Sequence, residues 1–286
     1  MMNQGEAAAI NKRIRMDAGA VAKRKMTAEM LTPTKINESK MNVIRLALFI
    51  GFLCVWEIAV RIGMVDPFYW SSPLKISEQF MLLISNGVLF HDTMFTLRST
   101  LLGFFIGTVL GVITGLSFWW SQLWAKVMEP FLVMLESVPK IALAPIVIIF
   151  FGIHLPSKIV MATLMTLIIT ALIVWNAVKT IDQDLIKMMY SLGANRFQVF
   201  LGVVIPSTIH WIISSLRTNI GFALSGAVVG EFIASTTGLG HMIHNAGQVF
   251  QVDVVYAGVL TLTAIAYGLY LTVGKIEQLV QKYLPF

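Results

Sequence analysis

Six long apolar segments constrain the fold of this sequence more than any other feature. They lie at about residues 43–62, 97–120, 127–152, 157–176, 207–233 and 254–275. A helix needs about 20 apolar residues to cross a bilayer, and each segment meets that length. Only 13% of the 286 residues are charged, whereas about a quarter are charged in a typical soluble domain. The sequence therefore predicts an all-α integral membrane domain over residues 43–286, with about six transmembrane helices.

The basic residues lie mostly outside these segments and indicate the orientation. Residues 1–42 hold eight Lys and Arg against four Asp and Glu, which predicts a disordered cytoplasmic tail beside anionic lipid rather than a nucleic-acid-binding face. With this tail inside, the cytoplasmic side also receives Lys126, Lys179, Lys187, Arg196, Lys275 and Lys282. The opposite side receives Arg61, Lys75, Arg98 and Lys158. The positive-inside rule then places both termini in the cytoplasm.

Two connecting segments are long enough to carry structure of their own. The outer one, residues 63–96, contains a stretch at 73–84 that predicts a short interfacial helix. The inner one, residues 177–206, predicts two helices joined by a turn. Its first helix should direct three apolar side chains towards one side: Leu185, Met188 and Met189. Gly193 is placed to end that helix, because glycine readily takes the left-handed conformation.

The second helix of the inner segment has apolar residues at three- and four-residue spacing, namely Phe197, Phe200 and Leu201. Pro206 should then open the fifth span, where its missing N–H group costs least. Together these features predict a helix–turn–helix at the inner face of the membrane.

This inner segment resembles the coupling loop of binding-protein-dependent permeases of ATP-binding-cassette (ABC) importers. The family signature is Glu-Ala-Ala, three residues, Gly, nine residues and Ile-x-Leu-Pro. Gly193, the nine-residue gap, Val203, Ile205 and Pro206 match it. Lys187-Met188-Met189 stands where the family has Glu-Ala-Ala, which is a departure from the signature. The resemblance implies that Lys187, Met188, Met189, Gly193, Ala194, Asn195 and Pro206 couple the permease to an ATPase.

The resemblance covers about residues 65–275 and is closest to the nitrate, sulfonate and taurine branch. It also rests on Glu136-Ser-Val-Pro139, Phe151-Gly152, Leu192-Gly193-Ala194, Gly230-Glu231 and Gly238-Leu-Gly240. It implies the type I importer permease fold in the inner membrane of a bacterium. It also implies three partners: an ABC ATPase dimer, an extracytoplasmic solute-binding protein and a second permease copy. No Gly-x-x-x-x-Gly-Lys-Ser/Thr phosphate loop occurs in the sequence, so we expect the ATPase, not this chain, to bind ATP-Mg.

The second apolar segment carries a ladder of glycines every four residues: Gly103, Gly107, Gly111 and Gly115. Four residues is slightly more than one helical turn, so the glycines form one groove in which another backbone can approach closely. Packing within the same subunit and packing between subunits are both open alternatives.

Charged residues inside apolar segments cost about 2.5–3.5 kcal/mol each on insertion scales and need a reason. Glu136 and Lys140 are four residues apart and can pair, on a segment that Pro139 interrupts. Arg217 lies eleven residues after Pro206, about 16 Å deep at 1.5 Å per residue. These residues and Glu231 are candidates for a translocation pathway, with Arg217 holding an anionic or polar solute. The alternative is that Arg217 pairs with a carboxylate and holds helices together.

Other functions have weaker support. His241 and His244 have no third ligand at zinc spacing, so we expect a loop there and no metal site. Ala223-Leu-Ser225-Gly226 approaches the motif of intramembrane serine proteases, but no histidine lies in a later span to act as base. We therefore expect no catalytic residues. A secondary transporter would show repeated halves, and the halves here differ. By resemblance the solute is a small anion such as a sulfonate or nitrate, with a vitamin or pyrimidine precursor as the alternative.

Overall fold

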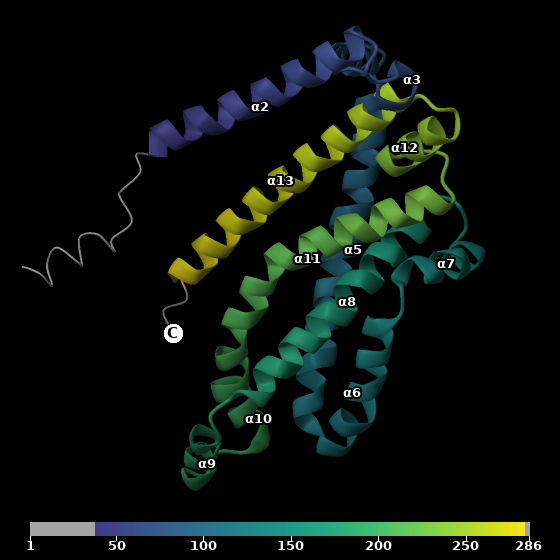
Figure 1. The fold of residues 1–286 in the computed structure, drawn as a ribbon. Helices are drawn as coiled ribbons and strands as arrows, with labels where there is room; N and C mark the ends of the chain where they lie inside the picture. Colours follow the sequence, from purple (N-terminus) through teal and green to yellow (C-terminus); the bar gives the residue numbers. More distant parts are fainter. Residues whose placement is uncertain (1–37, 284–286) are drawn as a thin grey trace, which may run out of the picture. The chain divides into compact units, whose positions relative to one another are not determined.

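The computed structural model describes residues 38–283, and within that range it contains helices and no strand (Figure 1). Contacts divide the chain into two units, residues 1–56 and 57–286. The described part of the first unit is residues 38–56 of helix α2 (Glu38–Arg61). Most of the predicted tail, residues 1–37, lies outside the described residues.

The second unit contains the other helices. On the amino-terminal side these are α3 (Pro67–Trp70), α4 (Pro73–Ser85), α5 (Val88–Ser117), the 3₁₀ turn η1 (Phe118–Trp120), α6 (Gln122–Ser137), the 3₁₀ turn η2 (Lys140–Leu143) and α7 (Ala144–Phe151). They are followed by α8 (Leu155–Lys179), α9 (Gln183–Ser191), α10 (Arg196–Val199), the π-helical turn η3 (Phe200–Val204), α11 (Ile205–Ile233), α12 (Leu239–Gln248) and α13 (Val252–Tyr283).

Five helices in the described range are long and apolar enough to cross a membrane, and a bent pair makes a sixth if it counts as one span. This agrees with the predicted all-α membrane class and with the predicted number of spans. The bent pair is α6 with the η2–α7 segment, which meet at 95°. The predicted third span, residues 127–152, is therefore not a single straight helix. Pro139 explains the break, because it holds Val138 in an extended conformation (ψ 131°) and ends α6.

Several predicted boundaries were wrong because helices continue through polar residues. The second span begins at Val88 rather than near residue 97, since Asp92 and Thr96 are buried on α5 rather than exposed in a loop. The predicted 234–253 loop contains helix α12, so His241 and His244 are helical.

The interfacial helix predicted at 73–84 is α4, and Ser72 caps its first turn.

The core of the second unit is formed by α5, α8 and α11 (Figure 1). The glycine ladder of α5 faces α8 of the same chain. A Cβ at Gly107 would lie 2.7 Å from Thr163 O and Thr166 Cβ, and one at Gly115 would lie 2.7 Å from Val174 Cβ. The two helices therefore approach as closely as their backbones allow. Helix α11 also packs on α8, where its buried Asn219 donates to Thr170 Oγ1 at 2.8 Å.

Candidate functional site

Helices α9 and α10 form a hairpin, which we call the α9–α10 hairpin (residues 182–199). Asp182 begins α9, because its carboxylate accepts a hydrogen bond from Asp184 N at 2.9 Å. Gly193 has the left-handed backbone that its position predicted, with φ of +83°. Two hydrogen bonds close the turn, from Gly193 N to Tyr190 O and from Ala194 N to Met189 O, both 3.0 Å long.

Asn195 starts the second half of the hairpin with a reciprocal cap. Its side chain accepts from Gln198 N at 2.9 Å, and its own N–H group donates to Gln198 Oε1 at 2.7 Å. The π-helical turn leads directly into α11, which begins at Ile205 and has Pro206 in its first turn, as predicted. A wider turn suits Pro206, because a proline ring clashes with the carbonyl four residues earlier in a regular α-helix.

The hairpin divides its apolar side chains between two faces. The inner face packs on the end of α8, where Ile186, Met189 and Ala194 contact a buried cluster: Val178, Ile181, Val199, Val203 and Val204. The outer face carries an exposed stripe, Leu185, Met188 and Leu192, which are 43%, 51% and 76% exposed. The prediction that Met189 shares a face with Leu185 and Met188 was therefore wrong. Met189 turns inward because the apolar end of α8 lies beneath it.

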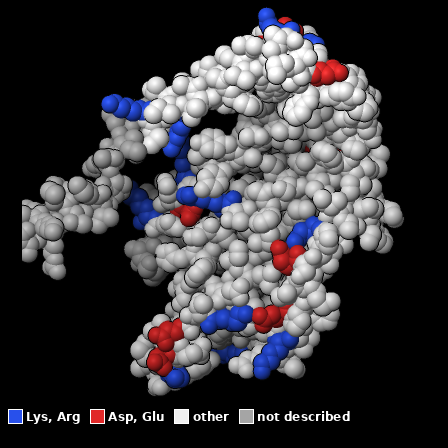
Figure 2. Space-filling view, in the orientation of Figure 1, with Lys and Arg blue, Asp and Glu red and all other residues white. Residues whose placement is uncertain are grey.

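Charged side chains gather at the same end of this unit (Figure 2). Lys187 pairs with Asp184 at 2.9 Å, and Lys179 at the end of α8 pairs with Glu129 of α6 at 2.7 Å. Lys187 stands where the permease signature has its glutamate. In the structure it pairs with the carboxylate of Asp184 on the same helix, α9.

Arg196 ties the hairpin to η1, the turn that follows α5, and no sequence signal predicted this. Its guanidinium donates to Trp119 O at 3.1 Å and to Trp120 O. It also lies over both indole rings, 5.2 Å and 5.5 Å from their centroids. Arg196 is 77 positions from Trp119 and 76 from Trp120 in the sequence. Helical periodicity relates only residues a few positions apart, so it could not predict this contact.

The charged residues predicted for a pathway fall into three separate places. Glu136 and Lys140 come together across the break after α6, with Lys140 Nζ 3.0 Å from Glu136 Oε2 and 2.8 Å from Glu136 O. Pro139 lies between them at the break itself.

Arg217 pairs with Glu277 of α13, donates to Gly274 O at 3.3 Å and lies 5.6 Å from the ring centroid of Tyr270. This contact matches the alternative in which Arg217 pairs with a carboxylate and holds two helices together. The sequence did not identify Glu277 as that carboxylate. The two partners lie on different helices and far apart in sequence, so their pairing depends on α11 packing against α13.

Glu231 is 1% exposed and lies near the other end of α11 from Arg217. Its Oε2 accepts from Thr96 Oγ1 at 2.9 Å and from Gly240 N at 2.8 Å. Thr96 in turn accepts from Leu239 N at 3.0 Å. The carboxylate therefore joins α5, α11 and α12. The structure does not bring Glu231 and Arg217 together.

Comparisons with known proteins identify the family. Residues 107–282 match the family described as "Binding-protein-dependent transport system inner membrane component". The riboflavin transport system permease protein RibX of Chloroflexus aurantiacus is 31% identical over 231 residues, covering 81% of this chain and 86% of that protein. The taurine transport system permease protein TauC of Escherichia coli is 28% identical over 231 residues, covering 79% of this chain and 84% of that protein.

The fold is also that of a solved importer. The inward-facing MetNI methionine ABC transporter superposes with a TM-score of 0.60 at 20% sequence identity, covering 71% of this chain and 98% of the matched chain. Family, membrane helices and fold agree. This chain belongs to the binding-protein-dependent transport system inner membrane components, and it is a membrane permease subunit of ABC importers rather than an enzyme.

Proposed function

We propose that this permease carries a small anion inward through a homodimer, and that its α9–α10 hairpin docks on a separate cytoplasmic ATPase. The observation that carries the docking proposal is the exposed stripe Leu185, Met188 and Leu192. An apolar stripe at i, i+3 and i+7 that runs along a short helix to the residue capping its C-terminus fits a groove on a partner protein. The chain itself carries no phosphate loop, so the ATP-Mg site belongs to the partner.

The orientation proposed from the sequence gives the hairpin access to such a partner. Lys126, Lys179, Lys187 and Arg196 would all lie on the cytoplasmic side, with both termini. Helices α3, α4 and α12 would then face outwards, towards an extracytoplasmic solute-binding protein. We place the basic tail, residues 1–42, beside anionic lipid on the inner surface.

Among the charged residues, Glu136 and Lys140 have the strongest claim to the pathway. They lie at a break in a span, where unpaired backbone carbonyls can line a polar route, and Glu136 is more than one-third exposed. Arg217 and Glu231 hold neighbouring helices in this structure, so a direct contact with solute would require their present partners to separate.

Cysteine cross-linking tests the docking proposal. Cys54 is the chain's single cysteine, and after its replacement by serine we expect Met188→Cys and Leu192→Cys to form adducts with a co-expressed ATPase. Glu78→Cys on α4, an exposed site at the opposite end, is the matched control and should form none. If no position in the hairpin forms an adduct while the assembled transporter hydrolyses ATP, the hairpin is not the docking element.

The solute is a second question with its own test. Similarity to TauC supports an organic sulfonate, whereas similarity to RibX supports a vitamin. Uptake of labelled taurine, nitrate, riboflavin and a pyrimidine precursor into proteoliposomes holding the whole transporter separates them. We expect ATP-dependent uptake of an anion. Uptake of riboflavin alone would overturn the anion proposal and leave the permease assignment intact.

A further inference from the structure

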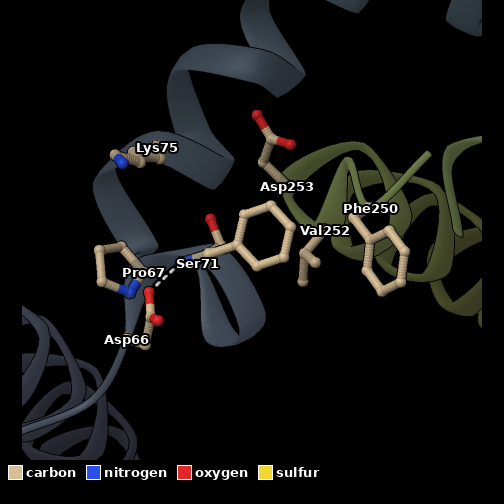
Figure 3. A pocket seen from close by; sticks show the side chains of 8 residues that line it. Asp66, Pro67, Ser71, Lys75, Phe250, Val252 and Asp253 are labelled. Atoms are coloured by element: carbon tan, nitrogen blue, oxygen red, sulfur yellow. Dashed lines mark hydrogen bonds between the residues drawn. The ribbon is translucent and has the colours of Figure 1, made fainter.

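A cavity of about 390 Å³ lies between two segments of the second unit (Figure 3), at the end that is far from the α9–α10 hairpin (Figure 1). One wall is formed by residues 66–75, which include α3 and the start of α4. The other is formed by residues 250–253, which include the end of the turn after α12 and the start of α13. The rings of Phe68 and Phe250 stack across the cavity with centroids 5.6 Å apart. This contact holds the two walls together.

The cavity contains an unsatisfied hydroxyl. Ser71 is 3% exposed, and its Oγ has no hydrogen-bond partner among residues 38–283. Buried polar side chains are almost always paired, so this unpaired hydroxyl in the cavity wall is available as a partner for a bound group. Figure 3 shows Ser71 between the carboxylates of Asp66 and Asp253.

The backbone is strained at the same place. Within the described residues, Ser71 (φ +53°) and Phe250 (φ +58°) are the two non-glycine residues with positive φ, and both line this cavity. Such conformations persist where surrounding structure enforces them, and they gather at ligand clamps. The strain is therefore concentrated where the orphaned hydroxyl lies.

The charges of the cavity favour a cation of a particular shape. Two carboxylates, Asp66 and Asp253, and a single amine, Lys75, line the cavity, and no ion pair joins Lys75 to either carboxylate in the described part of the chain. The described residues include no cluster of three or more His, Cys, Asp or Glu side chains that could hold a metal ion. A planar guanidinium suits the cavity better, because it carries five N–H donors and stacks on aromatic rings.

We propose that this cavity receives one arginine side chain of the extracytoplasmic solute-binding protein. The inference rests on the proposed function and its orientation, in which this end of the permease faces outwards. The guanidinium would donate to the carboxylates of Asp66 and Asp253 and to Ser71 Oγ, with its plane against the Phe68–Phe250 stack. Arginines inserted into a cavity of the partner are typical anchors of protein–protein interfaces.

The test measures binding of the solute-binding protein to the assembled transporter in lipid nanodiscs. Asp253→Asn and Asp66→Asn keep the side-chain shape and remove one charge each, and asparagine also suits the helix cap that Asp66 provides. We expect each variant to raise the dissociation constant by about tenfold or more. Glu78→Gln, an exposed acid on α4 outside the cavity, is the matched control and should change it less than twofold.

Two serine variants separate the hydroxyl from the strain. Ser71→Ala removes the hydroxyl and keeps the strained backbone, whereas Ser71→Gly removes the hydroxyl and relieves the strain. Equal weakening of binding in both variants supports the hydroxyl as a hydrogen-bond partner. Full affinity in Ser71→Gly would overturn that part of the proposal.

The outcomes keep this inference apart from the proposed function. If the unmodified transporter fails to bind its solute-binding protein, the proposed function itself is contradicted. If it binds, and both aspartate variants bind equally well, only the cavity proposal is overturned. Free arginine or guanidinium that binds the cavity at micromolar concentration without competing with the solute-binding protein would also overturn it, in favour of a small-molecule site.

Discussion

Gly193 holds the turn of the α9–α10 hairpin with φ of +83°, and a Cβ added at this residue would meet no atom within 4 Å. A side chain therefore has space, and the cost of replacing Gly193 comes from the backbone, at about 1–2 kcal/mol for an L-residue in this conformation. A β-branched residue is least suited to it, whereas asparagine is better tolerated.

We therefore predict that Gly193→Val inserts and assembles but uncouples ATP hydrolysis from uptake, or releases the ATPase. Hydrolysis and uptake are measured together in proteoliposomes. Gly193→Asn should be milder, and Gly202→Ala is the control, because its Cβ would make an ordinary 3.4 Å contact with Met189 Cε. Normal uptake by assembled Gly193→Val would show that the hairpin is not the coupling element.

Lys158 is another residue whose role rests on its contacts. It is fully buried, and its Nζ donates to Ile153 O and Ala234 O, both at 2.5 Å, and to Ser157 Oγ at 3.2 Å. It thereby joins the start of α8 to the end of α11.

Lys158→Met preserves length but leaves the part-buried carbonyls of Ile153 and Ala234 without this donor, which destabilises the fold. We predict a lower midpoint of thermal unfolding, measured by tryptophan fluorescence in detergent. Lys126→Met on exposed α6 surface should leave the midpoint unchanged. An equal midpoint in both variants would contradict the structural role of Lys158.

At the scale of elements, the contact between α5 and α8 depends on the absence of side chains. Gly107→Ala would place a Cβ 2.7 Å from Thr163 O and Thr166 Cβ, and the backbone atoms of α8 cannot move away by a rotamer change. We predict that the helices separate and that the yield of monodisperse permease falls sharply on size-exclusion chromatography. Gly268→Ala on α13 meets no atom within 4 Å and is the matched control.

Arg196 links two elements, the hairpin and the turn η1 that follows α5. Arg196→Ala removes both hydrogen bonds to the tryptophan carbonyls and the stacking on Trp119 and Trp120. Lysine cannot replace the planar contact. We predict that both Arg196→Ala and Arg196→Lys keep the ATPase adduct from Met188→Cys but lose most uptake. If uptake stays normal, the hairpin does not act on the transmembrane helices through α5.

At the scale of the whole molecule, five or six spans are few to enclose a gated route, so we predict a homodimer. Mass measurement of the detergent-purified complex should find two copies of this permease with the ATPase. A single copy, or one copy with a different permease, would contradict the prediction. The exposed apolar surface of α5, including Phe105 at 67%, suits contact with lipid or with a second copy.

The parts predicted best from sequence are those set by short-range patterns. The membrane class follows from the length of apolar segments, and α4 and the hairpin follow from Pro73, Gly193 and helical spacing. The start of α5 was missed because Asp92 and Thr96 read as loop residues until their partners on α11 and α12 are known. Pro139 predicted that the third span is interrupted. It did not predict the 95° angle at which α6 and the η2–α7 segment meet.

The amino-acid sequence alone was enough to establish a helical membrane protein with a glycine-turned hairpin between its fourth and fifth spans. Hydropathy and helix-ending residues depend on neighbours within one or two helical turns, so they can be recognised in the linear sequence. The partners of the charged residues came only from the folded chain: Glu277 for Arg217, Thr96 for Glu231, and the Trp119 and Trp120 carbonyls for Arg196. Those pairs join residues on different helices, up to 135 positions apart, and their formation depends on which helix faces pack together.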